Sequence, residues 1–286
     1  MASTLLVANT FSGNAADNTS LRFYGTTVSN AFANSGWVKT GDAGQINWGT
    51  VVANSTTNFT YGYEMWCMND ALQNAAPTFL KVTYKNGVVA TEPAFSFQLG
   101  SSTDTLGNLT GVPSATITMY GNGPAAVSPC YFVGAPSRLV MMLWTTTAGG
   151  VPLFFSVERT HDAGGNDTTD GVMMTAWGYN NGSLGNQLYW SYAGTPAGTT
   201  ENMGVFAATA TMTPSVMQVY PQYYCNGLFT NPSLNVLWAV NLTITPYAPI
   251  SVSFYGATRR YLPTLSLAYN TLRVGNITIY PMILWE

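Results

Sequence analysis

Residues 61–87 read YGYEMWCMNDALQNAAPTFLKVTYKNG, and the pattern in this stretch decides the fold class. Along 61–68 and again along 79–85, successive side chains fall alternately on two faces, and one face is more polar than the other. A period of two is typical of β-strands that have one wetter face. The residues between the two runs, 69–77, include types that turns prefer. The stretch therefore predicts two strands joined by a short polar connection.

Similar segments recur along the chain at intervals of roughly ten residues, with Gly- and Pro-containing turns between them. This spacing predicts a mainly β protein, an antiparallel, jelly-roll-like β-sandwich. Residues 17–32 differ, because Leu21, Tyr24, Val28 and Phe32 recur at the spacing of one helical face. They predict a short N-terminal amphipathic helix that ends at Asn34-Ser35-Gly36.

The strand pattern suggests how the chain is divided. Residues 1–180 are expected to form a main sandwich domain that includes the helix. Residues 181–286 are expected either to continue the same sheet system or to form a second small β domain.

The core is predicted from large apolar side chains at alternating strand positions and from two tryptophans that bracket a turn at 36–52, a stretch expected to form a compact hairpin. The predicted core residues are Trp37, Trp48, Tyr63, Met65, Leu80, Val82, Trp144 and Phe155. The chain closes on an apolar run that ends in Ile283, Leu284 and Trp285. A run this apolar is expected to complete a sheet or to form an interface with a neighbouring subunit.

The composition is poor in charge and rich in aromatic residues. Only 7% of the residues are charged, against roughly 25% in an ordinary soluble domain, and polarity comes from Asn, Thr, Ser and Gly instead. No apolar run reaches the roughly 18 residues that span a bilayer, so membrane insertion is not expected. A weakly charged surface favours packing against other protein, which predicts a homo-oligomer, a trimer or larger.

Other classes of partner and compartment are limited by charge and cysteine content. The formal net charge is −3 and no basic stripe is present, so nucleic-acid binding is not expected. The three cysteines, at positions 67, 130 and 225, are odd in number and widely spaced. Buried free thiols and synthesis in a reducing cytoplasm are expected. The N-terminus is too short and too uncharged for a signal peptide.

A search for catalytic residues assigns none. His161 is the single histidine, and a solvated position in a Gly/Asp loop is expected for it. Five carboxylates are candidates for a glycosidase pair by residue type alone: Glu64, Asp70, Glu92, Glu158 and Glu201. For Glu158, an ion pair with an arginine on a neighbouring strand, such as Arg138, is the favoured interpretation. The chain is therefore predicted not to be an enzyme and to need no cofactor.

The loop expected at 161–171 holds the candidate metal ligands Asp162, Asn166, Asp167 and Asp170. Oxygen ligands in a Gly-rich loop are what Ca²⁺ takes. The EF-hand spacing is absent, however, and turns use the same residues for their own backbone bonding. No metal site is therefore predicted.

Three stretches together resemble a known group of proteins. They are SGWVKTGDAGQINWGTVV (35–52), YEMWCMNDALQNAAPTFLKVTYKNG (63–87) and FFSVERTHDAGGNDTTDG (154–171). In this order and spacing they are similar to virion structural proteins of tailed bacteriophages, over roughly residues 1–190. The resemblance brings no catalytic residues with it. It implies cytoplasmic synthesis, repetition in a symmetric particle and no cofactor.

The leading hypothesis is therefore a non-enzymatic subunit of a phage tail, baseplate or fibre in the virion, with loops that contact a host receptor. One alternative is a capsid decoration (cement) protein on the exterior of the head. A second is a carbohydrate-binding module for a host surface glycan, and a third is a depolymerase with two carboxylates in a cleft. For a tail subunit and for a decoration protein, the expected partners are copies of the chain and other virion proteins.

Overall fold

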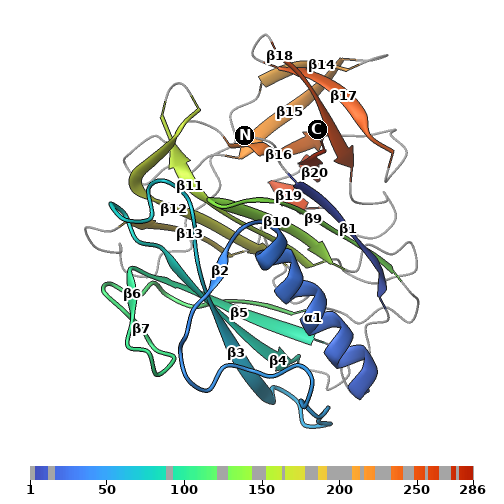
Figure 1. Ribbon diagram of the computed structural model, residues 1–286. Coiled ribbons are helices and arrows are strands. Elements are labelled where there is room, and N and C mark those ends of the chain that lie inside the picture. Colours follow the sequence, from blue (N-terminus) through green and yellow to red (C-terminus); the bar gives the residue numbers. More distant parts are fainter. Residues whose placement is uncertain are drawn as a thin grey trace.

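The computed structural model describes residues 4–11, 17–87, 93–120, 128–143, 153–162, 165–177, 186–191, 208–212, 216–222, 233–240, 248–254, 257–263, 272–274 and 277–285. The chain is mostly β, with antiparallel sheets and a helix near the N-terminus, which confirms the predicted fold class. Two sheets and the helix form the larger part of the structure in Figure 1, and a further sheet lies beside them.

The first sheet has five strands in the order β2-β3-β4-β5-β8. Their bounds are β2 Val38–Lys39, β3 Thr60–Cys67, β4 Phe79–Asn86, β5 Pro93–Gly100 and β8 Ile117–Tyr120. Strands β3 and β4 are the pair predicted from residues 61–87, and they are antiparallel. Along β4 half-buried and buried residues alternate at every position, as the period of two requires. A two-stranded hairpin follows β5, with β6 at Ser102–Thr103 and β7 at Leu109–Thr110.

The second sheet has six strands in the order β1-β9-β10-β11-β12-β13. Their bounds are β1 Thr4–Phe11, β9 Ser128–Ala135, β10 Arg138–Leu143, β11 Leu153–His161, β12 Asp167–Trp177 and β13 Asn186–Ser191. From β9 to β13, each strand pairs with the next strand in sequence. Among the described strands, the order within each sheet is therefore mainly that of a meander and differs from the jelly-roll order expected from the sequence. Strands that follow one another in sequence pair with each other as antiparallel neighbours.

Helix α1 spans Asn18–Asn34 and begins and ends where the sequence predicts. The side chain of Asp17 caps its first turn by accepting a hydrogen bond from the backbone N–H of Ser20, at 2.9 Å. The predicted apolar face, Leu21, Tyr24, Val28 and Phe32, is buried. In Figure 1 the helix runs along one side of the two sheets.

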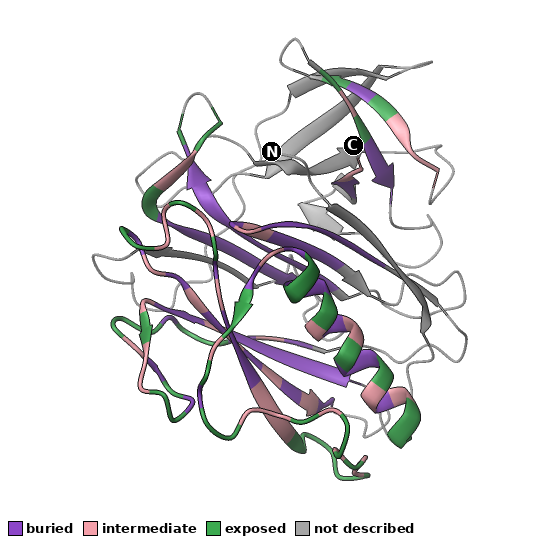
Figure 2. Cartoon of the chain, viewed as in Figure 1, coloured by how far each residue is buried: buried purple, intermediate pink, exposed green. Residues whose placement is uncertain are grey.

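The main core lies between the two sheets and α1. Phe97 of β5 and Phe155 of β11 stack with ring centroids 4.0 Å apart, which joins one sheet to the other. Tyr24 of α1 makes an edge contact with Phe95, at 5.5 Å between centroids. Figure 2 shows the buried residues gathered where the strands and the helix face one another. The two sheets and the helix therefore share one hydrophobic core.

Of the predicted core residues, Trp37, Leu80, Val82 and Phe155 lie in this core. Trp48 is half-buried and packs against it, and Trp144 lies outside the described residues. The stretch 36–52 is not a hairpin: β2 is its short strand, it pairs with β3, and the chain then continues as a loop.

Tyr63 and Met65 lie on the face of β3 opposite the core that the two sheets share. Met65 is fully buried there, beneath the loop at 40–46, as predicted for a core residue, whereas Tyr63 is only half-buried, which corrects its assignment to the core. The face of β3 that meets the core carries Trp66 and the carboxylate residue Glu64. The sequence shows the alternation of β3 correctly, but the apolar residues on one side do not show which face is inside.

The remaining described strands form a seven-stranded sheet in the order β16-β15-β14-β17-β18-β20-β19. Their bounds are β14 Ala208–Met212, β15 Val216–Gln222, β16 Ser233–Val240, β17 Ile250–Phe254, β18 Ala257–Pro263, β19 Leu272–Val274 and β20 Ile277–Leu284. Strand β20 pairs with both β16 and β18, so six of these strands form a closed ring. Strand β13 still belongs to the sheet of the main sandwich, and the described strands from β14 onward form the separate sheet.

The C-terminal run completes a sheet within its own chain, which is one of the two outcomes that the sequence predicts. An interface of Ile283, Leu284 and Trp285 with a neighbouring subunit stays a prediction. Ile283 is fully buried, opposite Val236 and Leu262 in the ring, and Leu284 is half-buried. The ring of Trp285 lies 6.5 Å from that of Tyr131 on β9, and so links the closed sheet to the sandwich. Within the described ranges, no helix combines the length and apolar character needed to cross a membrane.

One prediction concerns Gly25, on the buried face of α1. A Cβ built at this position lies 2.2 Å from the ring of Trp48, whereas one at Gly41 meets nothing within 4 Å. Gly25→Ala is therefore expected to lower the free energy of unfolding by about 1–3 kcal/mol through overpacking. Gly41→Ala is the matched control and should change it by less than about 0.5 kcal/mol. Urea denaturation measures both, and an unchanged midpoint for Gly25→Ala would show that Trp48 does not occupy this position.

Candidate functional site

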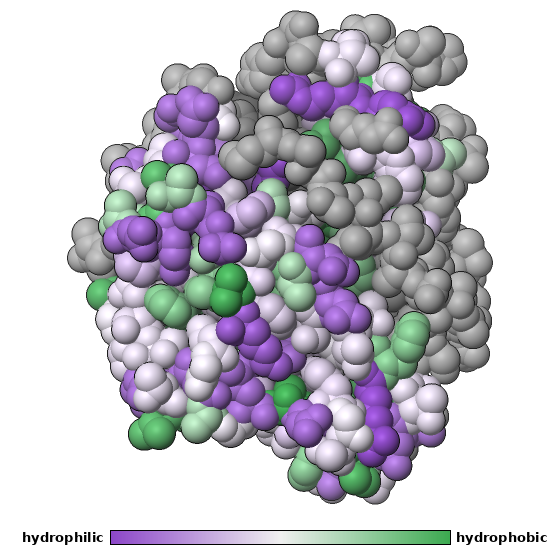
Figure 3. All heavy atoms as spheres, in the orientation of Figure 1, coloured by the Kyte–Doolittle hydropathy of each residue, from purple (hydrophilic) through white to green (hydrophobic). Residues whose placement is uncertain are grey.

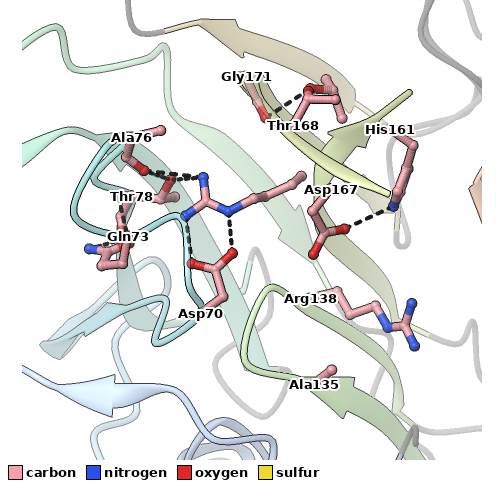
Figure 4. Close-up of polar contacts among 12 residues, drawn as sticks. Asp70, Gln73, Ala76, Thr78, Ala135, Arg138, His161, Asp167, Thr168 and Gly171 are labelled. Carbon is pink, nitrogen blue, oxygen red and sulfur yellow. Dashed lines mark hydrogen bonds and ion pairs between the residues drawn. The ribbon is translucent and has the colours of Figure 1, made fainter. Parts of the chain in front are cut away.

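The largest group of buried ionisable side chains lies where β11 and β12 meet the connection between β3 and β4 (Figure 4). Its central contact is the ion pair between Arg159 and Asp70. The guanidinium binds both carboxylate oxygens, with Nε–Oδ2 at 2.5 Å and Nη2–Oδ1 at 2.9 Å. The Arg159 side chain is fully buried, and that of Asp70 is 10% exposed. The pair joins β11 of one sheet to the connection between β3 and β4 of the other, 89 positions away in sequence.

Arg159 also fixes the connection 68–78. Its Nη1 donates to the carbonyl oxygen of Ala76 at 3.1 Å and to the hydroxyl of Thr78 at 3.4 Å. In the same connection, the side-chain oxygen of Gln73 accepts from the backbone N–H of Thr78 at 3.0 Å. A planar guanidinium with five donors suits this set of acceptors, and lysine could not replace it. The contacts are those of a structural clamp between the two sheets.

His161 lies at the end of β11 and is 8% exposed, so it is not the solvated loop residue that the sequence predicts. Strand β11 continues to His161 and β12 begins at Asp167, so both strands include residues that the sequence predicts to lie in the loop 161–171. Nε2 of His161 lies 3.3 Å from the carboxylate of Asp167. Arg138 and Glu158 face one another in the register of β10 and β11, as the ion-pair interpretation requires.

The charges around His161 set its protonation. Burial lowers the pKa of His161, but the hydrogen bond with Asp167 and the charge of Glu158 outweigh burial, although Arg138 opposes them, so the pKa is raised. For Asp167, burial raises the pKa, while bonds from His161 and Ser137 and the charge of Arg138 lower it, and the net change is downward. The imidazolium form is therefore stabilised at this position.

This arrangement lacks the order of a catalytic triad. A triad needs a nucleophile bonded to one ring nitrogen of histidine while a carboxylate holds the other. Ser137 instead bonds the same carboxylate as the histidine, that of Asp167. Nδ1 of His161 is buried, with no hydrogen-bond partner among the described residues. No hydroxyl in this part of the structure is placed for activation by the imidazole.

The four metal candidates are not brought together. Asp162 accepts hydrogen bonds from both the backbone and the side-chain amide of Asn166, at 2.9 Å and 3.2 Å. Asp167 pairs with His161, and Asp170 is exposed on β12. Among the described residues, no three His, Cys, Asp or Glu side chains are grouped as metal ligands. Turn bonding and an ion pair account for three of the four side chains.

A second buried carboxylate, Glu64, holds four different segments together. Oε1 accepts from Ser29 of α1 at 2.9 Å, from Lys39 of β2 at 2.7 Å and from the indole N–H of Trp48 at 3.2 Å. Oε2 accepts from the hydroxyl of Tyr84 at 2.5 Å. Glu64 is fully buried and its oxygens are saturated with donors. Burial and the adjacent carboxylate hold the pKa of Tyr84 well above its usual range.

Sequence reasoning named Glu64 as a glycosidase candidate by residue type and missed its partners. The available signal was its position on the face of β3 shared with Trp66 and Met68, because a carboxylate among buried residues must be bonded. Asp70 is likewise held by a buried partner, Arg159. Glu92 and Glu201 lie outside the described residues. Glu64 and Asp70 therefore act as internal anchors.

Comparisons with family models, curated proteins and solved structures find no match for this chain.

The Arg159–Asp70 pair gives a test by double substitution. Arg159→Met leaves a buried carboxylate without its ion pair and should lower the free energy of unfolding by about 3–5 kcal/mol. Adding Asp70→Leu removes the second charge and should recover most of that loss. Urea denaturation of both single variants and the double variant gives the coupling energy. Asp170→Asn, at an exposed position, is the control, and additive losses would contradict the clamp.

The raised pKa of His161 predicts a pH dependence of stability. The charged imidazole contributes fully below its ordinary pKa of 6.5, and this contribution is lost as the pH rises through the higher folded value. Stability should therefore decline across that interval. His161→Gln should remove this part of the slope, while Asp170→Asn should retain it. Melting temperatures measured from pH 5.5 to 8.5 in steps of about half a unit test this, and equal slopes for the wild type and His161→Gln would contradict it.

Proposed function

We propose that this chain is a non-enzymatic structural subunit of a tailed-phage virion, packed with copies of itself in a tail, baseplate or fibre. The observation that carries the proposal is where the few charges lie. Asp42, Glu64, Glu158 and Arg159 are buried, and Lys39 and Asp70 are engaged with two of them. Burial of these residues leaves few ionised groups on the surface, which favours contact with other protein.

The visible surface has the same character. In Figure 3 residues of intermediate hydropathy cover much of the described area, with small hydrophilic and hydrophobic groups scattered among them. Such a surface carries little charge repulsion between copies. Covering this surface with another protein costs little desolvation free energy, because few ionised groups must give up their water.

The three stretches that carry the resemblance to phage proteins also contact one another. Lys39 and Trp48, from 35–52, bind Glu64 in 63–87. Arg159, from 154–171, binds Asp70 in 63–87. The stretches on which the resemblance rests therefore include anchors of this fold, which supports the proposal that the likeness is one of architecture.

The test is to locate the chain in particles. Virions of the phage that encodes it are purified, and antibodies against the recombinant chain are applied for electron microscopy. Label on the tail is the expected result. Label spread over the head indicates the decoration protein instead, and particles that lack the chain by mass spectrometry contradict a virion role. Antibody against an unrelated virion protein controls for access.

A further inference from the structure

Strand β4 ends at Asn86, and the next residue is Gly87. An Asn-Gly pair is chemically reactive, because glycine leaves the following backbone nitrogen free to approach the side-chain amide. The nitrogen of Gly87 loses its proton to base and bonds to Cγ of Asn86, and the side-chain nitrogen takes up a proton and leaves as ammonia. Water then opens the resulting succinimide to aspartate or isoaspartate, so deamidation needs no other reactant.

The fold holds the amide of Asn86 at both ends. The side chain is fully buried. Its Nδ2 donates to the carbonyl oxygens of Asn54 and Thr56, at 2.7 Å and 2.8 Å. Its Oδ1 accepts from the hydroxyl of Tyr61 at 2.6 Å. Because Cγ has to bond the nitrogen of Gly87, formation of the succinimide requires the amide to leave these partners.

Backbone hydrogen bonds join the same two parts of the chain. The N–H of Asn86 donates to the carbonyl of Phe59 at 2.8 Å, and the N–H of Asn58 donates to the carbonyl of Gly87 at 2.9 Å. The segment 54–59 is therefore fastened to the end of β4 on both sides of the reactive peptide bond. We call this set of contacts the Asn86 lock.

The product of deamidation does not fit the lock. An aspartate in this place keeps an oxygen for the hydroxyl of Tyr61, but it has no N–H for the carbonyls of Asn54 and Thr56. An ionised carboxylate would then face two carbonyl oxygens in a buried position, which costs the donors' bonds and the desolvation of the charge. Isoaspartate also adds a carbon atom to the main chain, which displaces the backbone bonds at the end of β4.

We propose that Asn86 is a deamidation site that reacts only when the Asn86 lock opens, and that the reaction then keeps the segment 54–59 released. The rate in the folded chain is the rate in the unfolded chain multiplied by the fraction of molecules in which the lock is open. Because the product cannot remake the bonds to the two carbonyls, an opening that leads to reaction is irreversible. A local motion is thereby recorded as a covalent change.

The first measurement follows deamidation of the full chain at mildly alkaline pH, in buffer and in urea. Mass spectrometry of peptides, digested at acidic pH to avoid further reaction, detects the replacement of NH2 by OH at Asn86. The folded chain should react at least about tenfold more slowly than the chain in urea. Tyr61→Phe removes one partner of the amide and should raise the rate in buffer by about threefold or more. Tyr63→Phe, on the same strand but bonded to the carbonyl of Ala43, is the matched control and should react as the wild type does.

The second measurement places the product in the chain from the start. In Asn86→Asp, the segment 54–59 should exchange its backbone hydrogens about tenfold or more faster than in the wild type, as measured by mass spectrometry. Asn47→Asp is the matched control. It makes the same chemical change at an exposed residue whose side-chain oxygen accepts from the N–H of Gly49, a bond that a carboxylate also accepts, so exchange should not change.

Each measurement has a result that overturns one half of the proposal. A wild-type chain that deamidates at Asn86 as fast in buffer as in urea shows that the lock does not control the reaction, and this comparison needs no variant. Exchange of 54–59 in Asn86→Asp at the wild-type rate shows that the product is accommodated. If melting curves show that Asn86→Asp does not fold, wild-type chains that have reacted during incubation give the same comparison with unreacted chains.

Discussion

The sandwich depends on one buried ion pair that joins sheets formed from distant parts of the chain. Arg159 is fully buried at the end of β11, and its charge is stable there only because Asp70 and two further acceptors meet it. The acceptors all belong to the connection between β3 and β4, which has no regular structure of its own. The pair therefore positions a loop as well as two sheets, and it determines how the sheets are aligned at this end.

Glu64 also joins separate parts of the chain inside the core. A carboxylate that accepts from a helix, a short strand, a loop and a neighbouring β-strand defines one arrangement of four segments, where apolar contacts alone would tolerate several. Both anchors cost desolvation energy and offset it with saturated hydrogen bonding. With some of its few charges buried, the chain carries few ionised groups on its surface, and this weakly charged surface is the basis of the assembly role proposed for it.

Local patterns in the sequence were enough to predict α1, β3, β4 and the antiparallel β class. They work because periodicity and capping are properties of adjacent residues, as at Asp17 and along β4. They did not predict that Glu64 faces the core or that His161 is buried, because both depend on partners far away in the sequence. The same limit applies to the C-terminal strand. Its apolar residues indicate that it must be covered, but only the pairing with β16 and β18 shows that its own chain covers it.

The ring of strands that β20 closes also bears on biosynthesis. Strands β16 and β18 both pair with β20, which is translated after them. Strand β16 precedes β20 by about forty residues along the chain. During synthesis their open edges are exposed to other nascent chains, which is the condition under which strands pair wrongly. Productive folding of this part therefore has to follow synthesis of β20, whereas the strands of the sandwich all precede Ser191 or include it and are free to fold earlier.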